Sequence, residues 1–243
     1  MEKILNDYQL IELLDIKSLL KDYPVKEHED KEAKEVRDKA ITKIYDAIAK
    51  KLFDEYHIKK GDSTYDFLEI EFYYFDKGHK DYITYHRTIN KGKWFFHPSG
   101  MDISFESSCE EGFKKTSKAG ENFFGGILIR SLAKDGNIAI TGPLKCCWEL
   151  FDCFSAFELK PNELPIIERR SVVNQFEIYK TKRFINFDKA KAQKNYGDTN
   201  FISFNDHLLK RYRYYNKHPK WEEIKTRDYK ARPLNADNKD IRL

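Results

Sequence analysis

Residues 67–74 read FLEIEFYY, a run of aromatic and aliphatic residues that is typical of a β-strand but contains two acids. The side chains of a strand alternate between its two faces, so these positions sort into two sets. The apolar face is expected to hold Leu68, Ile70, Phe72 and Tyr74. The opposite face is expected to hold Glu69, Glu71 and Tyr73. The stretch predicts a strand with one face in the core and one acidic face. The acidic face is either exposed to solvent or part of a site.

Short runs of the same kind recur along the chain, separated by turn residues, and predict a curved antiparallel sheet. They are ITYHR (83–87), KWFFH (93–97), MDISF (101–105), GGILIR (125–130), VVNQFEIYK (172–180) and RYRYY (211–215). The polar segment 107–122 is expected to be a surface loop, and 188–200 a loop or a short helix. Residues 159–168, which include two prolines, are expected to connect elements.

Two segments have helical spacing. In residues 31–53 apolar side chains recur every four positions with charges between them, which predicts an amphipathic helix. These side chains are Val36, Ala40, Ile44, Ile48 and Leu52. A second helix is expected over 144–154, after Gly142 and Pro143, because proline suits the first turn of a helix.

The order of these elements predicts a single α+β domain over residues 1–243, with a curved antiparallel β-sheet or partly open barrel flanked by helices. Residues 1–30 are expected to be an N-terminal extension and residues 221–243 a polar, peripheral tail. A hydrophobic share of 40% and an aromatic share of 15% are high enough for a packed core.

Composition also bears on the cellular setting. The sequence has no run of 18 apolar residues and no signal-type start, so we expect a cytoplasmic protein without membrane contact. Its four cysteines lack the spacing of zinc ligands and do not suggest disulfides. Neither a metal nor a cofactor is expected.

Charge is distributed unevenly along the chain. Residues 165–243 carry 19 Lys plus Arg against 10 Asp plus Glu, whereas residues 1–164 carry 25 against 30. A basic C-terminal third points to a polyanionic partner. A solvent-exposed basic face is, however, a common cause of a modest excess of Lys and Arg over Asp and Glu.

Charged residues inside apolar strands are the strongest hint of a site, since burying an unpaired charge is unfavourable. Glu71, Asp102 and Arg130 occupy comparable places in three successive strands. They either converge on a polar pocket, pair with one another or face water.

The motifs taken in order resemble the alkyladenine (methylpurine) DNA glycosylase family. The resemblance spans residues 35–215 and rests on FLEIEFYY, His86, GMDISF, GGILIRSL, GPLKCCWEL and RYRYY. It implies the fold of that family, which formyltransferase C-terminal domains also resemble. It further implies a monofunctional enzyme that flips a modified base out of double-stranded DNA and hydrolyses its N-glycosidic bond.

The resemblance also assigns roles. Glu71 matches the catalytic glutamate, which activates water as a general base, and Arg130 matches the arginine that helps to hold this water. Tyr73 matches the residue that stacks on the base. His86 and Asp102 would line the base pocket, although Asp102 replaces an asparagine and so lacks an amide donor. Phe95, Phe96 and His97 are candidates for the wedge or the base platform, because the intercalating tyrosine of the family has no match.

Contacts with the DNA backbone are expected from basic residues that alternate with aromatics. They are Lys182, Arg183, Arg211, Arg213 and Lys217. For the RYRYY run, an edge strand with a charged outer face is an equally good interpretation. The partner would be duplex DNA with a modified base, bound by a monomer in the nucleoid. The alternatives are a non-catalytic nucleic-acid or nucleotide-binding protein on the same scaffold and an unrelated enzyme on a similar barrel.

Overall fold

The long strand β2 (Ser63–Asp76) lies in the middle of the sheet, as the FLEIEFYY run predicts. The computed structural model describes residues 5, 8–23, 31–115, 120–152, 156–158, 160, 163–183, 210–217 and 241–243. Within these residues the helices are α2 (Leu10–Leu13), α3 (Ile16–Leu19), α4 (Lys31–Glu55) and α5 (Pro143–Leu150). The other strands are β1 (Tyr56–Lys60), β3 (His79–Lys80), β4 (Trp94–His97), β5 (Gly100–Ser104), β6 (Phe124–Lys134), β7 (Ile138–Thr141), β8 (Ile166–Arg169), β9 (Ile178–Thr181), β10 (Arg213–Asn216) and β11 (Ile241–Arg242).

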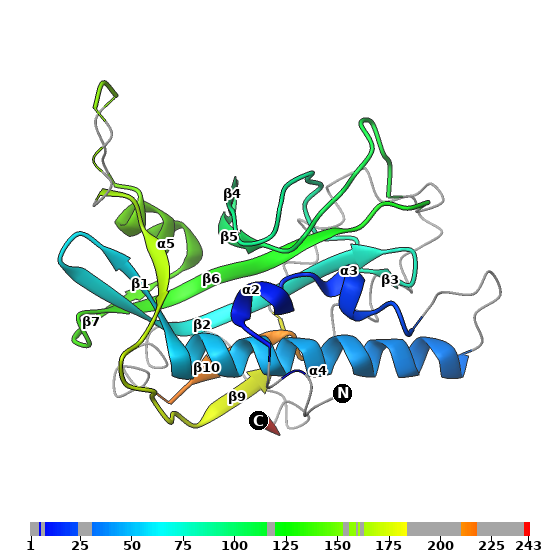
Figure 1. The fold of residues 1–243 in the computed structure, drawn as a ribbon, viewed down its shortest axis with the longest axis horizontal. Helices are drawn as coiled ribbons and strands as arrows, with labels where there is room; N and C mark the ends of the chain where they lie inside the picture. The colour runs from blue at the N-terminus through cyan, green and yellow to red at the C-terminus, as the bar shows by residue number, and fades with distance from the viewer. Residues whose placement is uncertain are drawn as a thin grey trace.

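The strands form one antiparallel sheet in the order β11-β9-β10-β2-β6-β5-β4, with β1, β3, β7 and β8 attached along its sides. The sheet curls into a half-barrel, and α4 runs along it with α2 and α3 beside the helix (Figure 1). This arrangement confirms the expected single α+β domain with a curved antiparallel sheet.

Helix α4 covers the apolar face of the sheet and confirms the helix predicted from residue 31. Its buried side chains form one cluster with β2, β5, β6 and α2. Val36, expected on the apolar stripe, is instead exposed, and the neighbouring Arg37 is buried. The guanidinium group of Arg37 donates to Asp76 and to the carbonyl of Tyr23, which ties the helix to the end of β2.

A double irregularity between β2 and β6 changes which residues face the core. Phe67 pairs with Leu132, Glu69 with Ser131 and Ile70 with Ile129. Leu68 of β2 and Arg130 of β6 therefore have no residue directly opposite them. Phe67 and Ile70 both enter the core, whereas Leu68 joins a small cluster on the other face. The strict alternation that placed Leu68 with Ile70 is therefore wrong, because this pair of bulges shifts the phase of both strands.

The predicted strands are confirmed in full or in part except for one. KWFFH, MDISF and GGILIR correspond to β4, β5 and β6, and RYRYY contributes to β10. Residues 83–88 form no strand. The ammonium group of Lys115 donates to the carbonyls of Tyr82 and Thr84, so a side chain satisfies backbone groups that a ladder would otherwise pair.

Several predicted boundaries shift. The connection expected over 159–168 contains the start of β8, and only the end of 172–180 forms β9. The segment 188–200 and most of the predicted tail lie outside the described residues, but β11 pairs with β9 at the edge of the sheet. Residues of the expected N-terminal extension enter the core through Leu10, Leu13 and Ile16.

Helix α5 follows Gly142 as predicted, but it ends at Leu150. Cys146 and Leu150 pack into the core, whereas Leu144 and Trp148 are exposed, the latter at 65%. Among the described cysteines, Cys109, Cys146 and Cys147 are free thiols.

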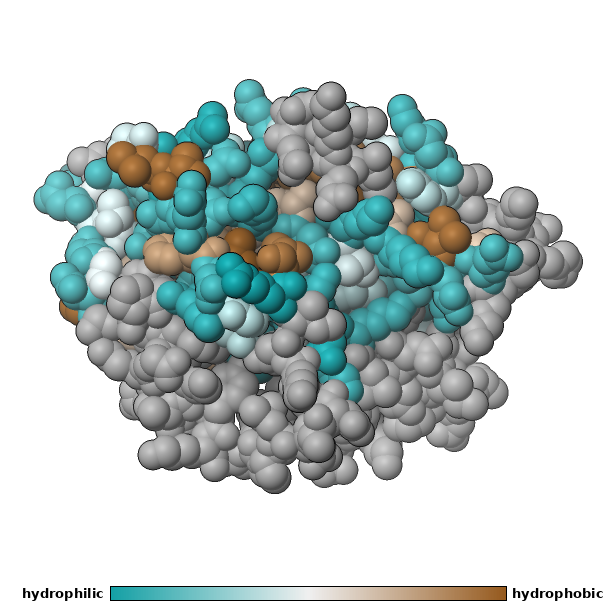
Figure 2. All heavy atoms as spheres, turned by 90° about the horizontal axis from the view of Figure 1, so that it is seen from below, coloured by the Kyte–Doolittle hydropathy of each residue, from teal (hydrophilic) through white to brown (hydrophobic). Residues whose placement is uncertain are grey.

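Figure 2 shows the face at the bottom of Figure 1, where hydrophilic side chains dominate the described residues and hydrophobic ones occur in small groups. Among the described residues, none of the helices has the length and apolar character needed to cross a membrane.

Phe72 is the centre of an aromatic stack in the core. Its ring lies 4.4 Å from that of Tyr45 at an interplanar angle of 17°, and 5.1 Å from that of Tyr214. We expect Phe72→Ala to lower the free energy of unfolding by about 3–5 kcal/mol, because the cavity removes these contacts. Denaturant unfolding measures this change, and Phe96→Ala is the control, since Phe96 is 52% exposed. Equal stability of the two variants would contradict the prediction.

Candidate polar site on the inner sheet

The face of the sheet opposite α4 carries a row of charged side chains set by strand register. Arg213 of β10 lies opposite Glu71 of β2, and Leu128 of β6 lies opposite both Glu71 and Asp102 of β5. Directly opposed residues project to the same face of a sheet, so Glu71 and Asp102 share a face two strands apart. At the usual spacing of strands this separation is roughly 9–10 Å.

Glu71 is completely buried, and both of its carboxylate oxygens lie near partners. The hydroxyl of Tyr73 donates to Oε1 at 2.6 Å, and Nη1 of Arg130 lies 2.7 Å from Oε2. Burial, and then the charge of Glu71, raise the pKa of Tyr73 well above its usual value, so the phenol stays protonated and donates. Among the described residues, Oε2 makes an ion pair with Arg130 but no hydrogen bond of regular geometry.

Glu69 forms a second buried ion pair next to the first. It accepts from Nε of Arg213, from Nε of Arg130 at 3.3 Å and from the hydroxyl of Ser131 at 3.1 Å. Burial would raise the pKa of Glu69, but the charges of Arg213 and Arg130 outweigh it and lower the pKa. Arg130 thus bridges both glutamates, and its side chain is 19% exposed.

Arg183 is also buried on this face. Its guanidinium group donates to both carboxylate oxygens of Asp81, at 2.6 and 3.2 Å, and lies 4.9 Å from the ring of Tyr73. Burial lowers the pKa of Arg183, but the Asp81 carboxylate reverses the effect and raises it. One face of Tyr73 is therefore covered by an arginine and is not available to stack on a base.

Asp102 lies in a separate cluster of fixed partners. It accepts from Nη2 of Arg87 at 2.6 Å and from Nε2 of His97 at 2.9 Å. The backbone N–H of Ser99 donates to Nδ1 of His97, so Nε2 carries the ring proton and donates to Asp102. The guanidinium group of Arg87 lies 3.8 Å from the centre of the Phe95 ring.

The remaining residues assigned to the base pocket lie apart from Glu71. The ring of His86 contacts Phe113 and Phe124, and desolvation together with the charge of Lys115 lowers its pKa to about 4. Phe96 packs its edge against Phe151 of the segment after α5. The structure brings Glu71, Arg130 and Tyr73 into contact, but it does not bring His86 or Phe96 to them.

The predicted backbone contacts divide into two groups. Arg183 and Arg213 are buried and paired within the protein, so their guanidinium groups are not presented to phosphates. Lys217 is exposed and pairs with Glu177 at 3.0 Å, while Lys182 and Arg211 are half-buried. Basic residues that look like a surface strip in the sequence are partly an internal network.

Sequence reasoning missed two charged residues of this face, namely Asp81 and Arg87. Arg87 ends a predicted strand run, where a charge usually faces solvent. His97, considered as a wedge or base platform, instead pairs with Asp102.

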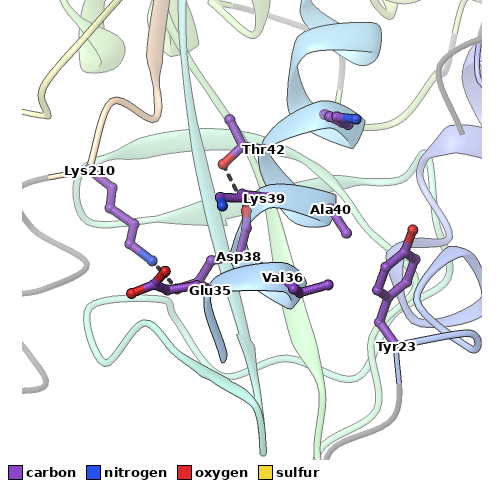
Figure 3. A pocket seen from close by; sticks show the side chains of 9 residues that line it. Tyr23, Glu35, Val36, Asp38, Lys39, Ala40, Thr42 and Lys210 are labelled. Carbon is purple, nitrogen blue, oxygen red and sulfur yellow. Dashed lines mark hydrogen bonds and ion pairs between the residues drawn. The ribbon is translucent and has the colours of Figure 1, made fainter. Parts of the chain in front are cut away.

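A groove of about 680 Å³ lies beside α4, away from these clusters (Figure 3). Asp38 on its wall contacts His79 and Lys210, and Thr42 donates to the carbonyl of Asp38. None of the residues predicted to form a site lines it. Within the described residues, no group of three His, Cys, Asp or Glu side chains is arranged to hold a metal ion.

Comparison of the chain with models of protein families, with curated proteins and with solved structures gave no match.

Arg213 should contribute to stability rather than to nucleic-acid affinity. We expect Arg213→Gln to lower the free energy of unfolding by about 3–5 kcal/mol, because it leaves the buried Glu69 carboxylate with less compensating charge. Denaturant unfolding measures this change. Lys217→Gln, which removes an exposed ion pair, should change stability little. An Arg213 variant as stable as the Lys217 variant would show that Arg213 is not held in the interior.

Proposed function

We propose that the protein hydrolyses the N-glycosidic bond of a modified base in double-stranded DNA, with Glu71 as the general base. The observation that supports this most directly is the position of the Glu71 carboxylate, held between the Tyr73 hydroxyl and the Arg130 guanidinium group. The resemblance of the motif order to alkyladenine DNA glycosylases, in fold and in activity, belongs to the same proposal.

The reaction needs a general base that takes a proton from water. It also needs a negative charge that stabilises the positive charge developing on the sugar. Oε2 of Glu71 takes a proton from a water molecule, whose oxygen then bonds to C1′ of the nucleotide. The C1′–N bond breaks, and its electron pair leaves with the base. Positive charge that develops on the sugar is stabilised by the carboxylate, as in other glycosyl transfers.

Each neighbour of Glu71 has a role in this scheme. Tyr73 fixes Oε1 by its hydrogen bond, so the carboxylate keeps one orientation. Arg130 is partly exposed and lies on the Oε2 side, where it can orient the water together with Glu71. Tyr73 acts here by positioning the carboxylate, and the stacking role inferred from the sequence is limited by Arg183 over its ring.

A second candidate is a nucleotide-binding protein without hydrolytic activity. It is favoured by the complete burial of Glu71 and by the internal pairing of Arg183 and Arg213, which reduces the basic surface for a long duplex. This candidate predicts binding of nucleosides or nucleotides but no abasic product.

Glu71→Gln tests the proposal. The purified chain is incubated with duplex oligonucleotides that carry a panel of modified bases, and alkali then cleaves any abasic sites. We expect base release by the variant to fall by roughly a hundred- to ten-thousand-fold, because the amide cannot accept the proton from water. DNA binding and the folded state, followed by circular dichroism, should be retained.

Glu168→Gln is the matched control, because Glu168 of β8 pairs with His57 of β1, away from the site. Its base release should equal that of the unmodified chain. Activity of folded Glu71→Gln at the level of this control would exclude Glu71 as the general base. Binding of nucleosides without base release from any duplex would favour the second candidate.

A further inference from the structure

The hydrogen bonds around Asp102 determine which groups of a nucleobase this part of the site can bind. From the sequence, Asp102 is expected to line the base pocket, where an ionised carboxylate can only accept hydrogen bonds. In the structure Oδ2 accepts from Arg87 and Oδ1 accepts from His97, so both oxygens already have a charged or polar donor. The group that is presented from this cluster is therefore a donor.

That donor is Nη1 of Arg87. The guanidinium group is fixed by Asp102, by the carbonyl of Tyr85 at 3.3 Å from Nε and by the Phe95 ring beneath it. Arg87 is only 5% exposed, and Nη1 has no hydrogen-bond partner within the described part of the chain. A buried donor without an acceptor is unfavourable by about 1–3 kcal/mol, so an acceptor from a ligand would be stabilising.

A second donor without a partner lies close by. Gly126 of β6 stands opposite both Tyr73 and Ser104, and Ser104 is fully buried. The hydroxyl of Ser104 has no hydrogen-bond partner among the described residues. A side chain at Gly126 would place its Cβ 2.7 Å from Nη1 of Arg87, so glycine is what lets the guanidinium group reach this position.

We infer that Nη1 of Arg87 and the hydroxyl of Ser104 bind an exocyclic carbonyl oxygen of the nucleobase, which makes the site selective for oxo bases over amino bases. A carbonyl oxygen has two lone pairs and accepts from two donors, whereas an amino group at the same place would face them with hydrogens. The inference rests on the proposed function, because that function brings a base to this face.

The charge of the face favours a neutral acceptor over a phosphate. Arg87 pairs with Asp102, Arg183 with Asp81 and Arg213 with Glu69. Arg130 is shared by the two glutamates of β2. The arginines of this face are therefore matched by carboxylates, which leaves little net charge to attract a dianion. A base carbonyl needs no such charge, because its oxygen is uncharged.

The test compares ligands that differ only in oxo against amino. Base release is measured from duplexes that contain hypoxanthine or adenine at one position, and uracil or cytosine at another. Binding of inosine and adenosine is measured separately by calorimetry, which requires no reaction. We expect the unmodified chain to favour the oxo ligand at least about tenfold, because the amino ligand leaves two buried donors unpaired.

Two variants remove the proposed donors. Ser104→Ala deletes the hydroxyl with little change in volume, and Arg87→Lys keeps a positive charge beside Asp102 but loses the planar fork. Both should lose most of the oxo preference while remaining folded by circular dichroism. Ser107→Ala is the control, because the Ser107 hydroxyl donates to the carbonyl of Phe105 and accepts from the N–H of Gly125. This variant should keep the preference.

The outcomes separate this inference from the proposed function. Base release without an oxo preference, or with a preference that both variants retain, would overturn the inference and leave the hydrolase intact. No base release, but an inosine preference that depends on Arg87, would overturn the hydrolase and support the inference. Absence of both release and nucleoside binding would overturn both. Displacement of inosine by inorganic phosphate in an Arg87-dependent way would show that the donors bind an anion, which also overturns the inference.

Discussion

The interior of this protein tolerates acids on its central strand only because arginines from other strands lie beside them. Glu69 and Glu71 are both buried, and an isolated carboxylate in that setting would be strongly unfavourable. Arg130 contacts both, and Arg213 completes the pairing. The sheet must hold β10, β2 and β6 in one register for these contacts to form. Charge pairing thus fixes the arrangement of the strands that the apolar face alone would specify less tightly.

Much of the fold could be predicted from periodicity. The run 67–74 and the helix from residue 31 are long enough for the alternation or the four-residue spacing to identify a strand and a helix, although single positions such as Leu68 and Val36 are misplaced. Shorter runs were less informative. ITYHR has the composition of a strand, but its backbone is bonded by Lys115, a residue about thirty positions later. No local pattern reports such a contact, and none reports the phase shift at Leu68.

The site was predicted in part for the same reason. Glu71 and Arg130 meet because each belongs to a strand whose position follows from the pattern. The partners of Arg183 and Arg213 are Asp81 and Glu69, more than a hundred residues away in sequence. A basic segment read by itself therefore looks like a surface strip. Only the pairing of distant strands reveals that two of its arginines neutralise internal acids.

The paired bulges of β2 and β6 have a consequence for how this chain can diverge. Leu68 on β2 and Arg130 on β6 each lack a residue directly opposite. The two bulges offset each other, so the pairing register is the same before and after them. Substitutions can accumulate on either strand without disturbing that balance. A single insertion or deletion on one strand would exchange its buried and polar faces beyond that point, so length changes here are expected to occur in compensating pairs. An alignment with any relative should therefore keep both strands free of isolated gaps.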